Sequence, residues 1–255
     1  MANKILKVLV IGDTHDSPDI PDKSRFGWFA KHIRKTKPDF VVQIGDFATF
    51  DSCTHYIRDD SYTAKIDKPI FMKDIESLDS AMEEFKYHLK DFKVKKYLTL
   101  GNHERRMWRK EDSNPTFYGM CQKEFFGTCK KYDWEVIPYG KYLMLGGVGF
   151  IHAPINPMGK EYGGEASERQ VANKSKIDIV FGHSHRAQDN RVSKISPIKN
   201  DFTRIINVGC AMPHNHIESY AKHSLTGWTY QICELKIWDN HIQEVNNISM
   251  QTLER

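Results

Sequence analysis

The chain has 255 residues, of which 40% are hydrophobic and 12% aromatic, and this apolar content excludes disorder as the main state. The 37 Lys and Arg residues against 33 Asp and Glu residues give a formal net charge of +4, too small by itself to indicate a nucleic-acid-binding protein. The apolar runs are short or interrupted by glycine, so we expect no transmembrane helix and no membrane partner.

The N-terminus loosely resembles a signal peptide, but Lys7 interrupts its apolar stretch and no small-residue cleavage site follows. We therefore interpret it as a first β-strand. The five cysteines are scattered and contain no Cys-x-x-Cys pair, a pattern typical of free thiols in a reducing compartment. We expect a cytoplasmic protein.

Short β-branched runs alternate with amphipathic helical patterns along the chain. In chain order, the predicted elements are strand 5–11, helix 24–35, strand 40–44, helix 75–92, strands 96–100, 134–137, 142–145 and 147–151, helix 167–174, and strands 177–181, 203–208 and 228–237. This order predicts a mixed α/β layered fold. Without a linker-like segment, we expect one domain over 1–255, with insertions at 53–95 and 105–131.

Polar residues follow several of these strands at the points where the strands end. The motifs are Gly12-Asp13-Thr14-His15, Gly45-Asp46, Gly101-Asn102-His103-Glu104, His152 and Gly182-His183-Ser184-His185. Because ligand-binding residues at the carboxyl ends of strands converge on one crevice, we expect these side chains to lie together. Carboxylate, amide and imidazole ligands without thiolate suit Mn, Fe or Zn ions.

Each motif taken alone has a plainer interpretation as a turn, a helix cap or a buried, hydrogen-bonded histidine. Their conjunction at successive strand ends favours a polynuclear metal site. Its candidate ligands are Asp13, His15, Asp46, Asn102, His152, His183 and His185.

This series of motifs resembles the calcineurin-like metallophosphoesterase superfamily, from residue 8 to about 210. Segments 45–52, 101–105 and 182–186 are more narrowly similar to phage-encoded members. The resemblance implies a four-layer α-β-β-α sandwich with the site at its edge. It also implies two divalent metal ions, with Mn favoured and Fe, Zn or Ni as alternatives.

The resemblance further implies a role for each candidate. Asp13, His15 and His185 would hold the first metal, Asn102, His152 and His183 the second, and Asp46 would bridge both. His103 would protonate the leaving group. Two divalent ions about 3.5–4 Å apart can share a hydroxide that attacks phosphorus, and their charge favours an anionic phosphoester.

The chain departs from the family pattern after the bridging residue. Where the family often has an aspartate that orients the catalytic histidine, this chain has Thr49, and the next acid is Asp51. Either Asp51 takes that role or His103 has no carboxylate partner. The Asp-Arg-Gly element of phosphoprotein phosphatases is also missing from this segment, which argues against that branch.

A basic run follows the Gly-Asn-His-Glu motif, and within it Arg105 is the candidate substrate-binding residue, because arginine grips phosphate oxygens in a bidentate way. The run has an equally plain interpretation as solvated charge on a helix. Aromatic residues nearby could stack on bases, although packing is the simpler explanation.

We therefore predict a dinuclear-metal phosphoesterase, with a phosphodiester or nucleotide-like substrate, possible nucleic acid included, favoured over a phosphoprotein. The alternatives are a phosphomonoesterase or phosphoprotein phosphatase, and a non-catalytic interaction module on the same fold. The module would be expected to have lost ligands or the catalytic histidine, whereas every motif position is present here.

Overall fold

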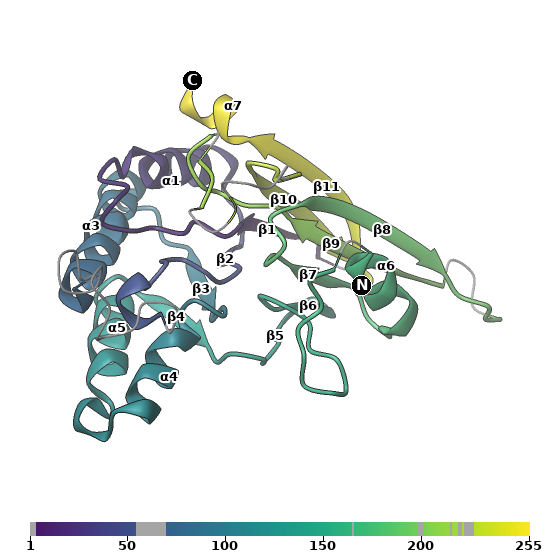
Figure 1. The fold of residues 1–255 in the computed structure, drawn as a ribbon. Helices are drawn as coiled ribbons and strands as arrows, with labels where there is room; N and C mark the ends of the chain where they lie inside the picture. Colours follow the sequence, from purple (N-terminus) through teal and green to yellow (C-terminus); the bar gives the residue numbers. More distant parts are fainter. Residues whose placement is uncertain are drawn as a thin grey trace.

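Two β-sheets pack face to face, and helices cover their outer faces in the computed structural model (Figure 1). The structure describes residues 4–54, 70–164, 166–197, 201–214, 216–218, 221 and 227–255. Layers of helix, sheet, sheet and helix make the four-layer α-β-β-α sandwich that the resemblance implied, so this prediction is confirmed.

The first sheet has six strands in the order β11-β10-β1-β2-β3-β4. Strands β1 to β4 run parallel, while β10 pairs antiparallel with β1 and with β11. The bounds are β1 Leu6–Ile11, β2 Phe40–Gln43, β3 Lys95–Thr99, β4 Trp134–Ile137, β10 Gln231–Trp238 and β11 His241–Ser249. The parallel order brings the carboxyl ends of β1, β2 and β3 to the same edge of the sheet.

The second sheet has five strands in the order β5-β6-β7-β9-β8. Its three central strands run parallel, and β5 and β8 pair antiparallel at its edges. The bounds are β5 Leu143–Leu145, β6 Val148–Phe150, β7 Ile179–Phe181, β8 Ala187–Ser193 and β9 Phe202–Val208. This arrangement places the carboxyl ends of β6 and β7 beside each other.

Helices α1, α3, α4, α5 and α7 lie on the side of the first sheet, and α6 covers the second sheet on the opposite side of the molecule (Figure 1). Two short 3₁₀ helices, η1 and η2, flank α4 and contact it. The bounds are α1 Ser24–Thr36, η1 Asp51–Cys53, α3 Phe71–Leu89, α4 Arg105–Ser113, η2 Pro115–Phe117, α5 Met120–Lys131, α6 Ser167–Lys174 and α7 Met250–Glu254.

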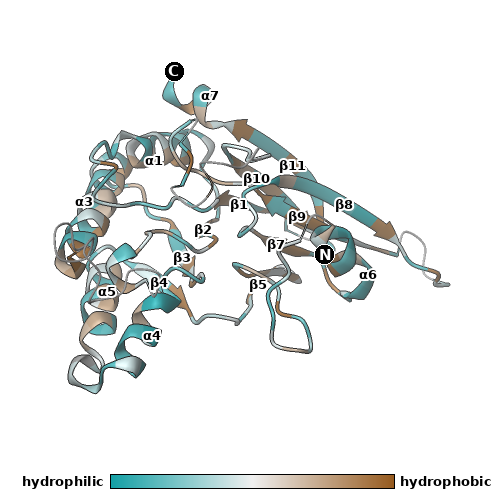
Figure 2. Cartoon of the chain, in the orientation of Figure 1, coloured by the Kyte–Doolittle hydropathy of each residue, from teal (hydrophilic) through white to brown (hydrophobic). Residues whose placement is uncertain are grey.

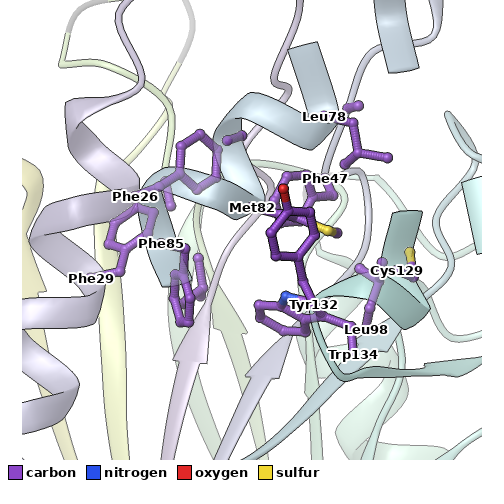
Figure 3. Close-up of a cluster of buried hydrophobic side chains, with 14 of the residues drawn as sticks. Phe26, Phe29, Phe47, Leu78, Met82, Phe85, Leu98, Cys129, Tyr132 and Trp134 are labelled. Carbon is purple, nitrogen blue, oxygen red and sulfur yellow. The ribbon is translucent and has the colours of Figure 1, made fainter. Parts of the chain in front are cut away.

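The last four residues of β1, Val8 to Ile11, are buried on both faces of the sheet, which explains why they are all apolar. Leu9 and Ile11 point into the cluster beneath the helices, and Val8 and Val10 point into the cluster between the sheets. The cluster beneath the helices is rich in aromatic rings from α1, α3 and β4 (Figure 3). A third, smaller cluster lies between the second sheet and α6.

The structure adds elements that sequence reasoning missed. Strands β8 and β11 are polar along most of their length and half-exposed, so they carry no clear alternation (Figure 2). Helices α4 and α5 occupy the segment 105–131. The other segment predicted as an insertion, 53–95, includes α3, and its residues 55–69 lie outside the described residues.

Among the described residues, no helix combines the length and apolar character needed to cross a membrane. All five cysteines are buried free thiols.

Candidate metal centre

The seven candidate ligands converge at one edge of the sandwich. Asp13, Asp46 and Asn102 follow β1, β2 and β3 of the first sheet. His152 follows β6, and His183 and His185 follow β7 of the second sheet. The remaining candidate, His15, lies two residues beyond Asp13. The site therefore spans both sheets.

The turns that carry these residues are tightly bent. His15, Asp46, His183 and His185 all have positive φ angles of 43°, 49°, 71° and 58°. Residues other than glycine rarely adopt this backbone conformation, and those that do cluster at functional sites.

Asp13, His15 and His185 form the first group of possible ligands. The His185 Nε2 atom lies 3.1 Å from Asp13 Oδ2 and 3.0 Å from His15 Nε2. All three side chains are at most 3% exposed. Two imidazole nitrogens and a carboxylate oxygen thus point at a common space.

His152 and His183 meet around Asn102 in a second group. The Asn102 Oδ1 atom lies 3.0 Å from His152 Nε2 and 3.0 Å from His183 Nδ1. The Nδ1 atom of His152 faces the Ile44 carbonyl oxygen at 3.1 Å. A hydrogen bond on that side fixes the tautomer and leaves Nε2 available to a metal.

Asp46 lies between the two groups. Its Oδ1 atom accepts a hydrogen bond from the His103 backbone N–H at 2.8 Å. Its Oδ2 atom faces His152 Nε2 at 3.3 Å and His15 Nε2 at 3.7 Å. The carboxylate can therefore contribute an oxygen to either side, as a bridging ligand must.

Two glycines allow the Asp46 and Asp13 carboxylates to pack directly against the backbone. A Cβ atom on Gly101 would lie 2.1 Å from Asp46 Oδ1, and a Cβ atom on Gly182 would lie 2.3 Å from Asp13 Oδ1. No side chain fits at such distances. The glycines of these two motifs are therefore required by the carboxylates that pack on them.

The buried carboxylates make the electrostatics of the site favourable for positive charge. Burial alone would raise the pKa of Asp46, but His152 and His103 beside it lower that pKa well below its usual value. Burial alone would lower the pKa of His152, but Asp46 and Asp13 raise it to about 10. Burial and the neighbouring histidines lower the pKa of His15, which keeps that imidazole neutral and able to ligate.

The residues present fit divalent metal ions. Asp13 Oδ1 is buried and has no hydrogen-bond partner among the described residues. A buried carboxylate oxygen is normally satisfied, and a cation beside it would offset the cost of burying this many polar groups. The donor set combines imidazole nitrogen with carboxylate and amide oxygen, which suits first-row divalent ions.

His103 lies beside the two groups and is 5% exposed. Its Nε2 atom is 4.0 Å from Asp46 Oδ2, and its ring packs edge-on against His15. Its Nδ1 atom donates to the Thr49 carbonyl oxygen at 3.0 Å. The Thr49 backbone thus occupies the place where a carboxylate was considered, and Asp51 instead accepts from Arg106.

Arg105 lies farther out, at the rim. It is exposed, and its guanidinium lies 4.7 Å from the centroid of the Tyr139 ring. The Tyr139 hydroxyl donates to Glu161, whose Oε2 atom is 3.8 Å from His183 Nε2. The structure therefore connects Arg105 to the ligand region through two intervening side chains.

The aromatic residues considered for base stacking serve packing in part. Phe125 is fully buried, and Trp108 is partly buried against the same cluster and stacks edge-on with Phe126. Phe126 and Tyr118 are exposed.

Sequence reasoning gave no role to Glu104, although it belongs to a quoted motif. Its carboxylate accepts hydrogen bonds from the backbone N–H groups of Asp46 at 3.0 Å, Phe47 at 2.8 Å and Gly101 at 2.8 Å. Burial and the nearby Asp46 carboxylate raise the pKa of Glu104 to about 7. Glu104 thus joins the turn after β2 to the turn after β3.

Asp16, directly after His15, is a second residue that sequence reasoning missed. It is fully buried and accepts from Arg25 Nη2 at 2.7 Å, Lys23 Nζ at 2.8 Å and Ser77 Oγ at 2.6 Å. These partners come from α1, its preceding residue and α3. The Asp16 network therefore anchors the turn after β1 to two helices.

A third missed residue is Glu218, whose Oε1 atom lies 3.6 Å from His15 Nδ1 on the side opposite the other ligands. No local motif surrounds Glu218 in the sequence, so only the fold reveals its position.

A family model described as calcineurin-like phosphoesterase matches residues 6–187. A comparison with curated protein sequences gives no match.

Several solved structures are similar at low identity. Vps29 from Entamoeba histolytica, in complex with zinc, is 12% identical over 96% of this chain and 99% of that chain, with a TM-score of 0.37. A metallophosphoesterase from Sphaerobacter thermophilus is 11% identical over 96% of this chain and 89% of that chain, with a TM-score of 0.46. A purple acid phosphatase from yellow lupin (Lupinus luteus) seeds is 11% identical over 99% of this chain and 55% of that chain, also with a TM-score of 0.46. Because the family model spans well over half of the sequence, this chain belongs to the calcineurin-like phosphoesterase family.

Proposed function

We propose that the protein is a dinuclear-metal phosphoesterase that hydrolyses a phosphodiester or nucleotide-like substrate. The observation that carries the proposal is the convergence of six further candidate ligands, with oxygen and nitrogen atoms, from both sheets around Asp46. A phosphoesterase needs concentrated positive charge at the phosphoryl group, and this ligand set can hold two divalent ions.

In this proposal Asp13, His15 and His185 hold one ion, Asn102, His152 and His183 hold the other, and Asp46 contacts both. Bound divalent ions supply Lewis-acid charge and lower the pKa of a coordinated water. The protein contributes ligands that are mostly buried, and Glu104 and the Asp16 network hold turns that carry them. Manganese remains the metal we favour.

His103 is the proposed proton donor to the leaving group. Its Nδ1–H is held by the Thr49 carbonyl oxygen, which directs Nε2 toward the side of Asp46. Replacement by asparagine should lower kcat by ~10²–10⁴-fold on esters with poor leaving groups. Activated aryl esters need little protonation and should lose much less.

The measurement compares kcat on an alkyl and a nitroaryl ester for wild type, His103→Asn and the surface control His88→Ala. His88 pairs with Glu84 on α3, a helix that supplies none of the candidate ligands, so its replacement should leave both rates unchanged. Metal content should stay at about two ions per chain in all three proteins. An equal loss on both esters would show that His103 does not donate the proton.

Three features support a diester or nucleotide-like substrate. The segment after Asp46 lacks an Asp-Arg-Gly element, the segment 105–131 is basic and aromatic, and the chain has a small positive net charge. Arg105, our candidate substrate-binding residue, is exposed at the rim, where it can reach a large substrate.

A substrate panel tests this choice. With Mn²⁺, kcat/KM should be higher on a bis-aryl phosphate or single-stranded DNA than on a phosphopeptide, and chelation should abolish every activity. An aryl monophosphate included in the panel measures the competing phosphomonoesterase function. A kcat/KM on the phosphopeptide far above every diester would overturn the substrate class, and no turnover with any metal would favour the interaction module.

The narrower similarity to phage-encoded members and the cytoplasmic location remain predictions. The first depends on three short motif segments, and the second on five cysteines that are all free and buried.

A further inference from the structure

Arg106, rather than its neighbour Arg105, lies against the proposed proton donor. The Arg106 Nη2 atom is 3.2 Å from His103 Nε2, the ring nitrogen that faces Asp46. Sequence reasoning favoured Arg105 because it directly follows the motif. The first turn of α4 instead directs Arg105 to Tyr139 and Arg106 to His103.

The guanidinium of Arg106 is held in a defined orientation. Its Nη1 atom donates to the Thr49 carbonyl oxygen at 2.8 Å and to Asp51 Oδ1 at 3.0 Å. The same Thr49 carbonyl oxygen accepts from His103 Nδ1. Arg106 and His103 are therefore fixed to one another through a shared backbone acceptor.

The charge of Arg106 is only partly compensated. Its side chain is 16% exposed, whereas its carboxylate partner Asp51 is 49% exposed and therefore well screened by water. A guanidinium has five N–H donors, and the contacts within the described residues use three of them. A mostly buried cation with free donors is a suitable partner for an anionic ligand.

The location of Arg106 determines which part of a bound substrate it would contact. His103 separates Arg106 from Asp46, and Asp46 is the carboxylate shared by the two ligand groups. A phosphoryl group bound at those groups would thus present its outer oxygens to His103 and Arg106. The planar fork of arginine matches two such oxygens, which the point charge of lysine does not.

We propose that Arg106 binds the phosphoryl group of the substrate and that Asp51 is its positioning residue, an inference that rests on the proposed function. When phosphate binds, Nη2 exchanges His103 Nε2 for a phosphoryl oxygen. That exchange frees Nε2, which must take up a proton before it can donate one to the leaving group. Asp51 thereby acts on catalysis through Arg106 rather than through His103.

The test uses the full chain loaded with Mn²⁺ and inorganic phosphate as the probe, with binding measured by calorimetry. Arg106→Ala should weaken phosphate binding by ~10–10²-fold, as expected for loss of charge-assisted hydrogen bonds. Arg106→Lys should recover only part of the loss, and Asp51→Asn should weaken binding by a few-fold. The matched control is Arg109→Ala, an exposed arginine on the same helix, which should bind phosphate as wild type does.

Metal content and thermal unfolding are measured for each variant. Arg106→Lys keeps the proposal testable if Arg106→Ala folds poorly. Wild-type phosphate affinity in Arg106→Lys, or in a folded, metal-loaded Arg106→Ala, would overturn the proposal. Binding does not require turnover, so the two proposals fail separately. Arg106-dependent phosphate binding without hydrolysis of any ester would refute only the proposed function, and unchanged kcat/KM in Arg106→Ala would refute only the role of Arg106.

Discussion

Replacing Asp46 by alanine is expected to remove both metal ions and to lower kcat/KM by more than ~10³-fold, because two-metal stabilisation of the reacting phosphoryl group is worth several kcal/mol. Asp46 Oδ2 faces ligands of both groups, and Oδ1 holds the turn that carries Asn102 and His103. Its loss should therefore affect the two ions together. Replacing His185 should weaken mainly the ion held with Asp13.

Elemental analysis of the purified variants measures this difference directly. Asp79→Ala is a suitable control, because Asp79 pairs with Lys131 at the surface. That variant should retain about two ions and full activity. Full metal occupancy in Asp46→Ala would contradict the bridging assignment, whatever happens to the rate.

Replacing Asp16 by alanine is expected to destabilise the fold by ~3–5 kcal/mol, the usual cost of removing one partner from a buried ion pair. Arg25 is 2% exposed and would remain charged with no carboxylate at its Nη2 atom. Lys23 would lose the same partner. The turn after β1 would also lose its connection to α3 through Ser77.

Chemical denaturation of the chelated proteins measures the change without a contribution from metal binding. The exposed pair provides the comparison again, since Asp79→Ala should cost ~0–1 kcal/mol. Asp16→Asn should lie between the two, because the amide oxygen still accepts hydrogen bonds but no longer compensates the cations. A free energy of unfolding for Asp16→Ala within 1 kcal/mol of the Asp79→Ala value would contradict a stabilising role for the network.

Much of the fold could be predicted because its central strands are buried on both faces. Strands β1 and β2 are short, largely apolar runs, and each is followed by a glycine and an aspartate. Strands β8 and β11 could not be predicted in this way. They are stabilised mainly by pairing with β9 and β10, and pairing leaves little trace in a polar sequence.

The ligand motifs could be predicted because each is a short run of residues at the end of a strand, in most cases beside a glycine. The residues that support these motifs are bound to distant parts of the chain: the partners of Asp16 on α1 and α3 lie 9 and 61 positions away. The choice between Arg105 and Arg106 depends on the phase of a helix whose start the sequence does not mark with a capping residue. Such positions follow from tertiary packing rather than from any short pattern.

Each group of ligands takes side chains from both sheets. Asp13 and Asp46 come from the six-stranded sheet, while His185 and His152 come from the five-stranded one. The centre consequently cannot assemble before chain segments more than 100 positions apart have met. Metal binding would then stabilise the packing of the two sheets against each other. Its binding free energy would add to that of the apolar contacts between the sheets.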